Sequence, residues 1–161
     1  PLPADEEPAR LVRPQGDGLL LMSGRVRRVE ITPAAAELLR SLQGEHGPLV
    51  FHQSGGCCDG SAPMCYPAKE FRIGQRDVLL GEVEGTPFFI GALQFEYWQH
   101  THLTVDCVPG RGAGFSVEGP RGLRFLIRSR LFTDEEYARQ QAEPPLHRGP
   151  LEGETALFRS L

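Results

Sequence analysis

A short segment rich in glycine and cysteine constrains this chain most, because it interrupts regular structure between two parts of the sequence. Ser54 to Cys65 reads SGGCCDGSAPMC and holds three of the four cysteines. Its glycines allow positive φ angles and close approach to a bound group, and its proline fits neither a helix interior nor a central strand. We therefore predict a loop that presents clustered thiols and is the functional centre of the protein.

The residues before this loop predict a strand, a helix and a second strand. Residues 25–30 alternate basic and β-branched side chains, which is typical of a short strand. Thr32 and Pro33 indicate a helix start, since the hydroxyl caps free amides and proline suits the first helical position. Apolar residues follow at helical spacing until the glycines of segment 44–47. Residues 49–52 are predicted to form a strand that enters the loop directly.

After the loop the sequence predicts mainly β-structure. Residues 95–98 are aromatic and fit either a strand or a helical turn, and residues 133–136 begin a short helix with an acidic first turn. The patterns predict strands over 77–83, 87–90, 102–108, 115–118 and 123–131. The expected class is α+β: a mostly antiparallel or mixed β-sheet structure with one main helix.

The length of 161 residues favours one domain, which we place at residues 18–141, because domains commonly hold about 100–150 residues. Residues 1–17 lack an apolar period and are predicted to be a flexible N-terminal arm. Prolines and glycines in 142–161 predict a C-terminal tail.

Charge and hydropathy exclude several classes of protein. A net charge of −4 argues against a general nucleic-acid binder. No apolar run approaches the roughly 18 residues of a membrane-spanning helix, and no signal peptide is visible. We expect a cytoplasmic protein with neither nucleic-acid nor membrane partners. In that compartment, clustered cysteines indicate metal binding or redox chemistry in preference to structural disulfides.

Five residues are candidate metal ligands. Soft metals and iron–sulfur clusters take thiolates, and a glycine-rich loop lets several thiolates converge. Seven residues separate the first and third loop cysteines, which does not fit the C-x2-C spacing of zinc fingers or thioredoxins. Adjacent side chains of an extended segment point apart, so one of the neighbouring pair is expected to face the site. The candidates are Cys57, Cys65, Cys58, Cys107 and His52, with iron, an iron–sulfur cluster or zinc as the bound group.

These candidates also have structural alternatives. Free cysteines are among the most buried residues, and Cys107 falls on the apolar face of its strand. Cys57 and Cys65 would suit a disulfide if the chain were exported. His52 ends the strand that enters the loop, where it fits a ligand, a base for a thiol or a hydrogen-bonded structural histidine.

Other motifs carry less information. His100 and His102 would share one face of a strand, which fits either a metal pair or a solvated polar face. Gly110 to Gly114 lacks the lysine and the strand–loop–helix order of a phosphate loop, so we expect a tight turn beside the site. No Ser-His-Asp order and no glycosidase-type carboxylate pair stands out.

Two stretches of the sequence carry a resemblance to a known family. Phe51 to Cys65, together with Gly110 to Ser116, resembles a bacterial family of unknown function whose genes often sit beside aldehyde dehydrogenases. The resemblance covers roughly residues 30–132. It implies a cytoplasmic protein with an accessory role in aldehyde or alcohol metabolism and an aldehyde dehydrogenase as partner.

The order of elements is also similar, more remotely, to the HesB/IscA-like A-type iron–sulfur carriers. Those carriers have a helix opened by T-x-x-A, a G-G-C-x-G loop, an Asp-led strand, a strand after a turn, an I-D-Y strand and a final G-x-G-F segment. The matching pieces here are Ile31–Ala36, Gly55–Gly60 with one residue inserted, Asp77–Val78, Gly85–Ile90, Val105–Cys107 and Gly112–Pro120. The similarity implies a HesB-like fold and a homo-oligomer.

The carriers end in a Cys-Gly-Cys pair, and nothing like it follows Pro120. Only Cys57 corresponds to a ligand of that family, so a metal site here would need Cys58, Cys65, Cys107 or a histidine as substitutes. Three functions remain open. The first is a small metal- or Fe–S-binding accessory or carrier protein. The others are a thiol-based redox or aldehyde-handling enzyme, with a loop thiol activated by loop amides or His52, and a dehydrogenase-binding module with structural cysteines.

Overall fold

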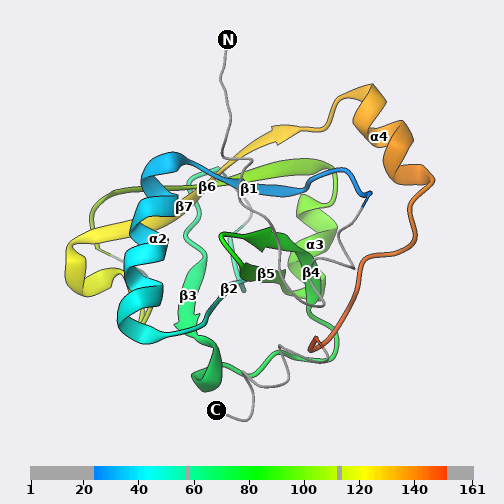
Figure 1. Ribbon diagram of the computed structural model, residues 1–161. Coiled ribbons are helices and arrows are strands. Elements are labelled where there is room, and N and C mark those ends of the chain that lie inside the picture. The colour runs from blue at the N-terminus through cyan, green and yellow to red at the C-terminus, as the bar shows by residue number, and fades with distance from the viewer. Residues whose placement is uncertain (1–23, 57–58, 112–113, 152–161) are drawn as a thin grey trace.

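The computed structural model describes residues 24–56, 59–111 and 114–151 (Figure 1). The predicted arm lies outside these residues, as do Cys57 and Cys58. In chain order the elements are β1 (Val29–Ile31), α2 (Pro33–His46), β2 (Leu49–Gln53), β3 (Met64–Pro67), η3 (Ala68–Glu70), β4 (Val78–Val83), β5 (Thr86–Ile90), α3 (Ala92–Trp98), β6 (Thr101–Pro109), η4 (Gly119–Arg121), β7 (Leu123–Leu131) and α4 (Asp134–Gln141).

The strands form two mixed sheets, one with the order β1-β6-β7 and one with the order β3-β2-β5-β4. The pairs β1–β6 and β2–β5 are parallel, and the other pairs are antiparallel. This confirms the α+β class with mixed sheets. One main helix is not apparent, because the described residues contain three α-helices. Figure 1 shows α2 along one side of the sheets and α4 at the opposite end of the molecule.

The core lies between the two sheets. Phe51 of β2 contacts Phe125 of β7 edge to face, with ring centroids 5.1 Å apart, and stacks on Phe88 of β5 at 5.5 Å. All three side chains are fully buried. Because successive side chains of a strand point to opposite faces, Val50 and His52 point to the other side of the four-stranded sheet. Val50 packs there in a second, smaller cluster.

Helix α2 forms as its sequence predicts. The Thr32 hydroxyl accepts a hydrogen bond from the amide of Ala35, and the apolar stripe of the helix is buried. Gly44 lies within the helix, which ends at Gly47, where φ is +80°. That positive φ suits glycine. Of the two glycines expected to end the helix, Gly47 is therefore the one that ends it.

Two local predictions were wrong. The strand expected at 115–118 is a turn that leads into η4, and β3 was not predicted. Part of the predicted tail is described: the amide of Gly149 donates to Asp77, the amide of Leu79 donates to His147, and Leu151 is buried. No described helix is long and apolar enough to cross a membrane.

Candidate functional site

The residues before the two adjacent cysteines are held by β2 and α3. The Gln53 side-chain amide donates to the carbonyl of Gly55. The indole N–H of Trp98, at the end of α3, donates to the carbonyl of Gly56 at 3.2 Å. Gly56 has a φ of +86°, and a Cβ atom there would lie 2.5 Å from the hydroxyl oxygen of Ser61. Glycine is therefore required for this close approach.

The residues after the two cysteines are held by β7. The amide of Gly60 donates to Ile127 at 2.7 Å, and the amide of Ile127 donates to Ser61 at 2.8 Å. The carboxylate of Asp59 accepts a hydrogen bond from the amide of Ser129. The segment 59–61 thus covers the free edge of the three-stranded sheet. The loop is anchored to the four-stranded sheet on one side of Cys57 and Cys58 and to the three-stranded sheet on the other.

A chain of polar contacts runs from Asp77 through His52 to the loop. The Nε2 atom of His52 lies 3.1 Å from the carboxylate of Asp77, and the Nδ1 atom lies 2.6 Å from the hydroxyl of Ser54. The imidazole is buried and Ser54 is exposed. A carboxylate only accepts hydrogen bonds, so Nε2 carries a proton, and in the neutral ring Nδ1 then accepts the hydroxyl proton of Ser54.

An open groove of about 510 Å³ lies beside the loop. The described residues that line it are uncharged: Gln53, Ser54, Gly55, Gly56, Ser61, Ala62, Met64 and Tyr66. Gln53 is 1% exposed, and its Oε1 atom is buried without a hydrogen-bond partner in the described part of the chain. Small-molecule sites combine apolar walls with a few placed polar groups, and the groove has that composition.

Cys65 lies in the core, on β3. Its side chain is fully buried, and burial followed by the nearby Glu118 carboxylate raises the pKa of the thiol well above its usual range. Its amide donates to the hydroxyl of Ser116 at 2.8 Å, and its carbonyl accepts from Val117. The structure therefore gives Cys65 the surroundings of a packed core thiol.

Cys107 lies on β6 opposite Phe125 and is half-buried against the core. Burial and the adjacent Asp106 raise the pKa of its thiol. Both ring nitrogens of His52 are engaged, as described above. Among residues 24–56, 59–111 and 114–151, no three His, Cys, Asp or Glu side chains gather as a metal site would need. A site that includes Cys57 or Cys58 stays a prediction.

The two histidines of the predicted pair do not share a strand. His100 is exposed in the turn before β6, whereas His102 is buried within β6 with its Nε2 atom 3.3 Å from the carboxylate of Glu30. His100 contacts Tyr137 instead. The turn thus places the two imidazoles in different environments.

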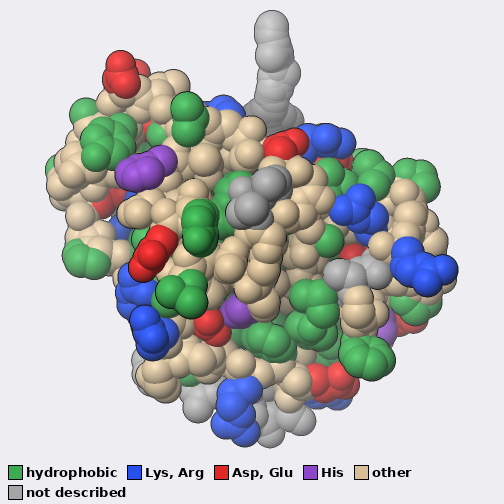
Figure 2. Space-filling view, turned by 180° about the vertical axis from the view of Figure 1, so that it is seen from behind, with side chains coloured by type: hydrophobic (Ala, Val, Ile, Leu, Met, Phe, Trp, Pro, Cys, Tyr) green, Lys and Arg blue, Asp and Glu red, His purple; other side chains and the backbone are tan. Residues whose placement is uncertain are grey.

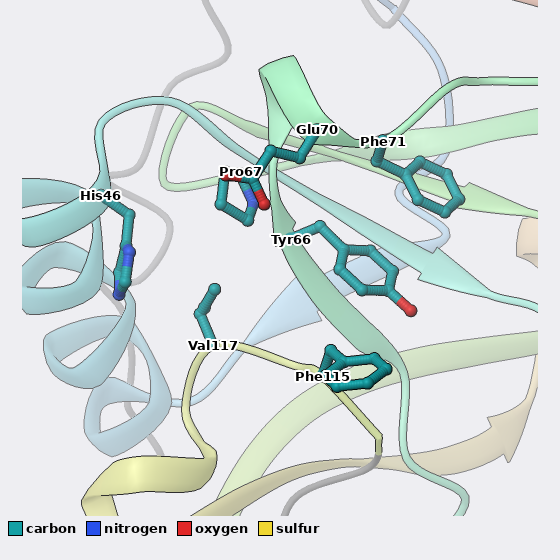
Figure 3. Close-up of a pocket in the computed structure, with 7 residues that line it drawn as sticks. All are labelled: His46, Tyr66, Pro67, Glu70, Phe71, Phe115 and Val117. Atoms are coloured by element: carbon teal, nitrogen blue, oxygen red, sulfur yellow. The ribbon is translucent and has the colours of Figure 1, made fainter.

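A second hollow of about 570 Å³ adjoins the first at Tyr66 (Figure 3). The Tyr66 ring stacks on Phe71 with centroids 4.9 Å apart. Phe115 is 92% exposed and lines the same hollow in Figure 3. Val117 and His46 line the side of the hollow that faces away from Phe71. On the face seen in Figure 2, hydrophobic side chains form separate patches divided by polar and charged ones.

Sequence reasoning missed the polar groups around the loop. Asp77 was assigned only to the start of a strand, and Gln53, Ser54 and Trp98 had no assigned role. Ser54 lies two residues after His52, and that spacing was the one available signal. The contacts of Asp77 and Trp98 join residues far apart in the chain, and no sequence motif marks them.

Comparison with known proteins gives a family and no activity. No curated protein matches the chain. A family described as a domain of unknown function, DUF779, matches residues 38–131. This match covers more than half of the 161 residues and includes the loop, the four-stranded sheet, strands β6 and β7 and the Asp77–His52–Ser54 contacts. The chain therefore belongs to the DUF779 family.

Proposed function

We propose that this protein carries out reversible thiol chemistry on a small carbonyl compound of the aldehyde class, at the groove beside its glycine–cysteine loop. The observation that carries the proposal is the chain of contacts from Asp77 through His52 to Ser54. Ser54 is exposed, lines the groove and precedes Cys57 by three residues. Asp77 orients the imidazole, and the imidazole exchanges a proton with the loop through the Ser54 hydroxyl.

The proposed step is addition of a thiol of Cys57 or Cys58 to the carbonyl carbon. A sulfur–carbon bond forms, the π electrons of the carbonyl group move to oxygen, and that oxygen takes up the proton that the thiol releases. The product is a hemithioacetal, and reversal restores both partners without an oxidant or reductant. Ser54 and His52 relay the proton, while the anchored flanks of the loop limit its motion during the reaction.

A metal- or Fe–S-binding carrier is the second candidate. It is supported by the anchoring of the loop on both sides of Cys57 and Cys58, since held flanks reduce the cost of ordering thiolate ligands. The resemblance of the order of elements to A-type iron–sulfur carriers, which implies a HesB-like fold, also favours this candidate. The described residues do not supply a ligand set, so Cys57 and Cys58 would have to provide the core of any site for iron, a cluster or zinc.

A docking role is the third candidate, and the exposure of Phe115 beside a hollow favours it. The proposed partner is an aldehyde dehydrogenase in the cytoplasm, and a homo-oligomer would use the same kind of surface. Large exposed aromatic residues are enriched at protein interfaces. Co-purification with such a dehydrogenase that is lost in Phe115→Ser would support this candidate.

The decisive experiment uses the full chain purified without oxygen. Iron and zinc are measured per chain, and the rate of thiol alkylation is followed at neutral pH in the wild type and in Cys57→Ala, Cys58→Ala and Cys65→Ala. We expect one thiol that is alkylated fast, and its fast phase should be lost in Cys57→Ala or in Cys58→Ala. The fast phase should remain in Cys65→Ala, because the Cys65 thiol of the wild type is buried in the core. Retention of the fast phase in the double variant Cys57→Ala, Cys58→Ala would refute the thiol proposal. Bound metal that Cys57→Ala releases would favour the carrier.

The role of the relay has its own control. His52→Gln should slow alkylation of the fast thiol, whereas His147→Gln should not, because His147 contacts the backbone of Pro150 and not the loop. Equal rates in both variants would leave His52 with a structural role only.

A further inference from the structure

We propose that Ser54 is itself a nucleophile, and that the protein hydrolyses small uncharged esters through an acyl-serine intermediate in the groove beside the loop. A serine, a histidine and a carboxylate within hydrogen-bond reach of one another form the arrangement that activates a hydroxyl group for acyl transfer. Ser54, His52 and Asp77 have that arrangement. This activity goes beyond the thiol chemistry proposed above, because it requires neither Cys57 nor Cys58.

The imidazole of His52 is held in the orientation of a general base. Its Nε2 atom lies 3.1 Å from a carboxylate oxygen of Asp77, and the same oxygen accepts a hydrogen bond from the amide of Gly74 at 2.8 Å. The ring of Phe71 packs beside the imidazole, with ring centroids 5.0 Å apart. Since the carboxylate fixes the proton on Nε2, the Nδ1 atom of the neutral ring keeps its lone pair for the hydroxyl of Ser54.

The hydroxyl of Ser54 meets the requirements of the nucleophile. It lies 2.6 Å from Nδ1 of the buried imidazole, while the residue itself is exposed and lines the groove. An exposed hydroxyl can hydrogen-bond to water, so the fold does not need this contact to satisfy Ser54. The contact instead gives one hydroxyl both a base within reach and access to a substrate in the groove.

The residues around Ser54 fit an uncharged acyl group. Every described residue of the groove is uncharged, and Ala62, Met64 and the ring of Tyr66 supply apolar surface. The amide of Gly55 follows the nucleophile directly and donates to no backbone carbonyl of the described residues. The amide after a serine nucleophile commonly donates to the oxyanion of the intermediate, and we assign that role to Gly55.

The reaction is an acyl transfer to water in two steps. In the first step, the oxygen of Ser54 bonds to the ester carbonyl carbon while its proton moves to Nδ1 of His52. The tetrahedral intermediate then expels the alcohol, which takes up that proton. In the second step, water gives a proton to Nδ1 and attacks the acyl-serine, and the oxygen of Ser54 leaves and takes the proton back. The products are a carboxylic acid and an alcohol, and no oxidant or reductant is consumed.

The test uses the full chain with two probes, p-nitrophenyl acetate and a fluorophosphonate. We expect catalysed release of p-nitrophenol, and we expect covalent labelling by the fluorophosphonate that peptide mapping places on Ser54. No turnover of the ester, no labelling, or a label on a different residue would each overturn the proposal.

Variants connect the turnover to the three groups. Ser54→Ala removes the attacking oxygen and should lower kcat/KM for p-nitrophenyl acetate by about 10²–10⁴-fold. Asp77→Asn should lower kcat and leave KM nearly unchanged, because it disturbs the tautomer of the base and not the groove. Ser41→Ala is the matched control, since the Ser41 hydroxyl accepts from Arg121 and does not line the groove. Equal activity in Ser54→Ala and Ser41→Ala would contradict the assignment.

The loop cysteines separate this inference from the proposed function. The double variant Cys57→Ala, Cys58→Ala should lose the fast thiol and keep both ester hydrolysis and the label on Ser54. Loss of hydrolysis in this variant, with its circular dichroism unchanged, would identify a thiol as the nucleophile and remove this inference alone. Hydrolysis by a wild type in which no thiol reacts fast would remove the proposed function alone.

Discussion

At the scale of single residues, Gly56 is the position of the loop where a side chain is least tolerable. Its φ of +86° disfavours any L-residue, and a Cβ atom would also lie 2.8 Å from the Cβ of Ser61 and 3.2 Å from the amide nitrogen of Gln53. Gly56→Ala should lower the free energy of unfolding by about 1–3 kcal/mol, the range for a strained backbone position.

The matched control for Gly56 is its neighbour. A Cβ atom at Gly55 would meet nothing within 4 Å, and the φ of Gly55 is not positive. Gly55→Ala should therefore change stability by less than about 0.5 kcal/mol. Urea denaturation of both variants measures the difference. Equal losses would mean that the approach of Gly56 to Ser61 is not a constraint.

The burial of the Cys65 thiol predicts that the protein loses stability at alkaline pH. Burial holds the pKa of its thiol well above the ordinary value of 9.0 in the folded state, whereas an unfolded thiol titrates near that ordinary value. Stability from this group is complete below the unfolded pKa and is lost as the pH rises above it, because only the unfolded state releases the proton. Between pH 9 and 10 the free energy of unfolding should fall with a slope approaching ~1.4 kcal/mol per pH unit from this residue.

The comparison is with Cys65→Ala, which lacks the thiol. Denaturant titrations of both proteins from pH 7 to pH 10 give the two slopes. The variant should show a shallower loss, with the remainder coming from Cys107 and other groups. Parallel pH profiles would show that Cys65 ionises equally readily in the folded and unfolded protein.

The burial of single residues could be predicted from the sequence where it follows from the local hydrophobic pattern. The apolar stripe of α2 and the inward positions of β6 were predicted, since each follows from the period of a helix or a strand. The environment of Cys65 was not, because its burial depends on contacts with Ser116 and Val117, about fifty residues away. Residue type alone does not separate a ligand from a core thiol.

At the scale of elements, helix α4 depends on its first turn. The Thr133 hydroxyl accepts a hydrogen bond from the amide of Glu136, and the Glu136 carboxylate accepts one from the amide of Thr133. Hydrogen bonds from Arg130, above all, and from Thr133 lower the pKa of Glu136 to about 2. The stability that this carboxylate contributes is present above its ordinary pKa of 4.5 and is lost as the pH falls toward 2.

Glu136→Gln should thus reduce the protection of the Tyr137 amide from hydrogen exchange at neutral pH. The reduction should correspond to about 0.5–1 kcal/mol, the usual range for a helix cap at an exposed site. Near pH 2 the variant and the wild type should converge. Glu135→Gln removes an equal charge from the same turn and leaves the capping box intact, so it should change protection less. A difference that persists at pH 2 would contradict the role of the Glu136 charge.

Elements differed from expectation where tertiary contacts outweigh local preference. Residues 115–118 alternate like a strand, yet the Ser116 side chain and the Val117 amide bind β3, and Glu118 turns inward. β3 itself contains Pro67 and follows a glycine-rich loop, so it had little local β signal. Its pairing with β2 supplies the missing stabilisation. The long strands β6 and β7 were predicted because their patterns span nine residues each.

At the scale of the whole molecule, the arrangement of the two sheets could not be predicted from the sequence. Parallel pairing of β1 with β6 joins residues more than seventy positions apart, and nothing local encodes that choice. Residues 54–56 and 59–63 break the regular structure as predicted, whereas Met64 and Cys65 of the predicted loop belong to β3. The attachment of the loop to α3 through Trp98 on one side and to β7 through Ile127 on the other depends on contacts between residues far apart in the chain.

A buried carboxylate links the two sheets. The Glu118 side chain is fully buried; its Oε2 atom accepts from the amide of Phe125 on β7 at 3.1 Å, and its Oε1 atom accepts from the hydroxyl of Ser116. That hydroxyl oxygen in turn accepts from the amide of Cys65 on β3. Glu118→Ala would leave the Phe125 amide without a partner, at a cost of about 1–3 kcal/mol, and would leave the Ser116 hydroxyl only the carbonyl of Cys65, 3.4 Å away. We expect a loss of roughly 2–4 kcal/mol in the free energy of unfolding, measured by urea denaturation.

Glu118→Gln tests whether the charge or the hydrogen bonds matter. The amide oxygen of glutamine still accepts from Phe125, and its NH2 group donates to the Ser116 oxygen, whose hydrogen then turns to the carbonyl of Cys65, 3.4 Å away. Because every donor keeps a partner and no charge is buried, this variant should lose less than about 1 kcal/mol. Ser116→Ala leaves the Cys65 amide unpaired and should fall between the two. If Glu118→Gln costs as much as Glu118→Ala, the negative charge itself holds the two sheets together, and the hydrogen-bond explanation is wrong.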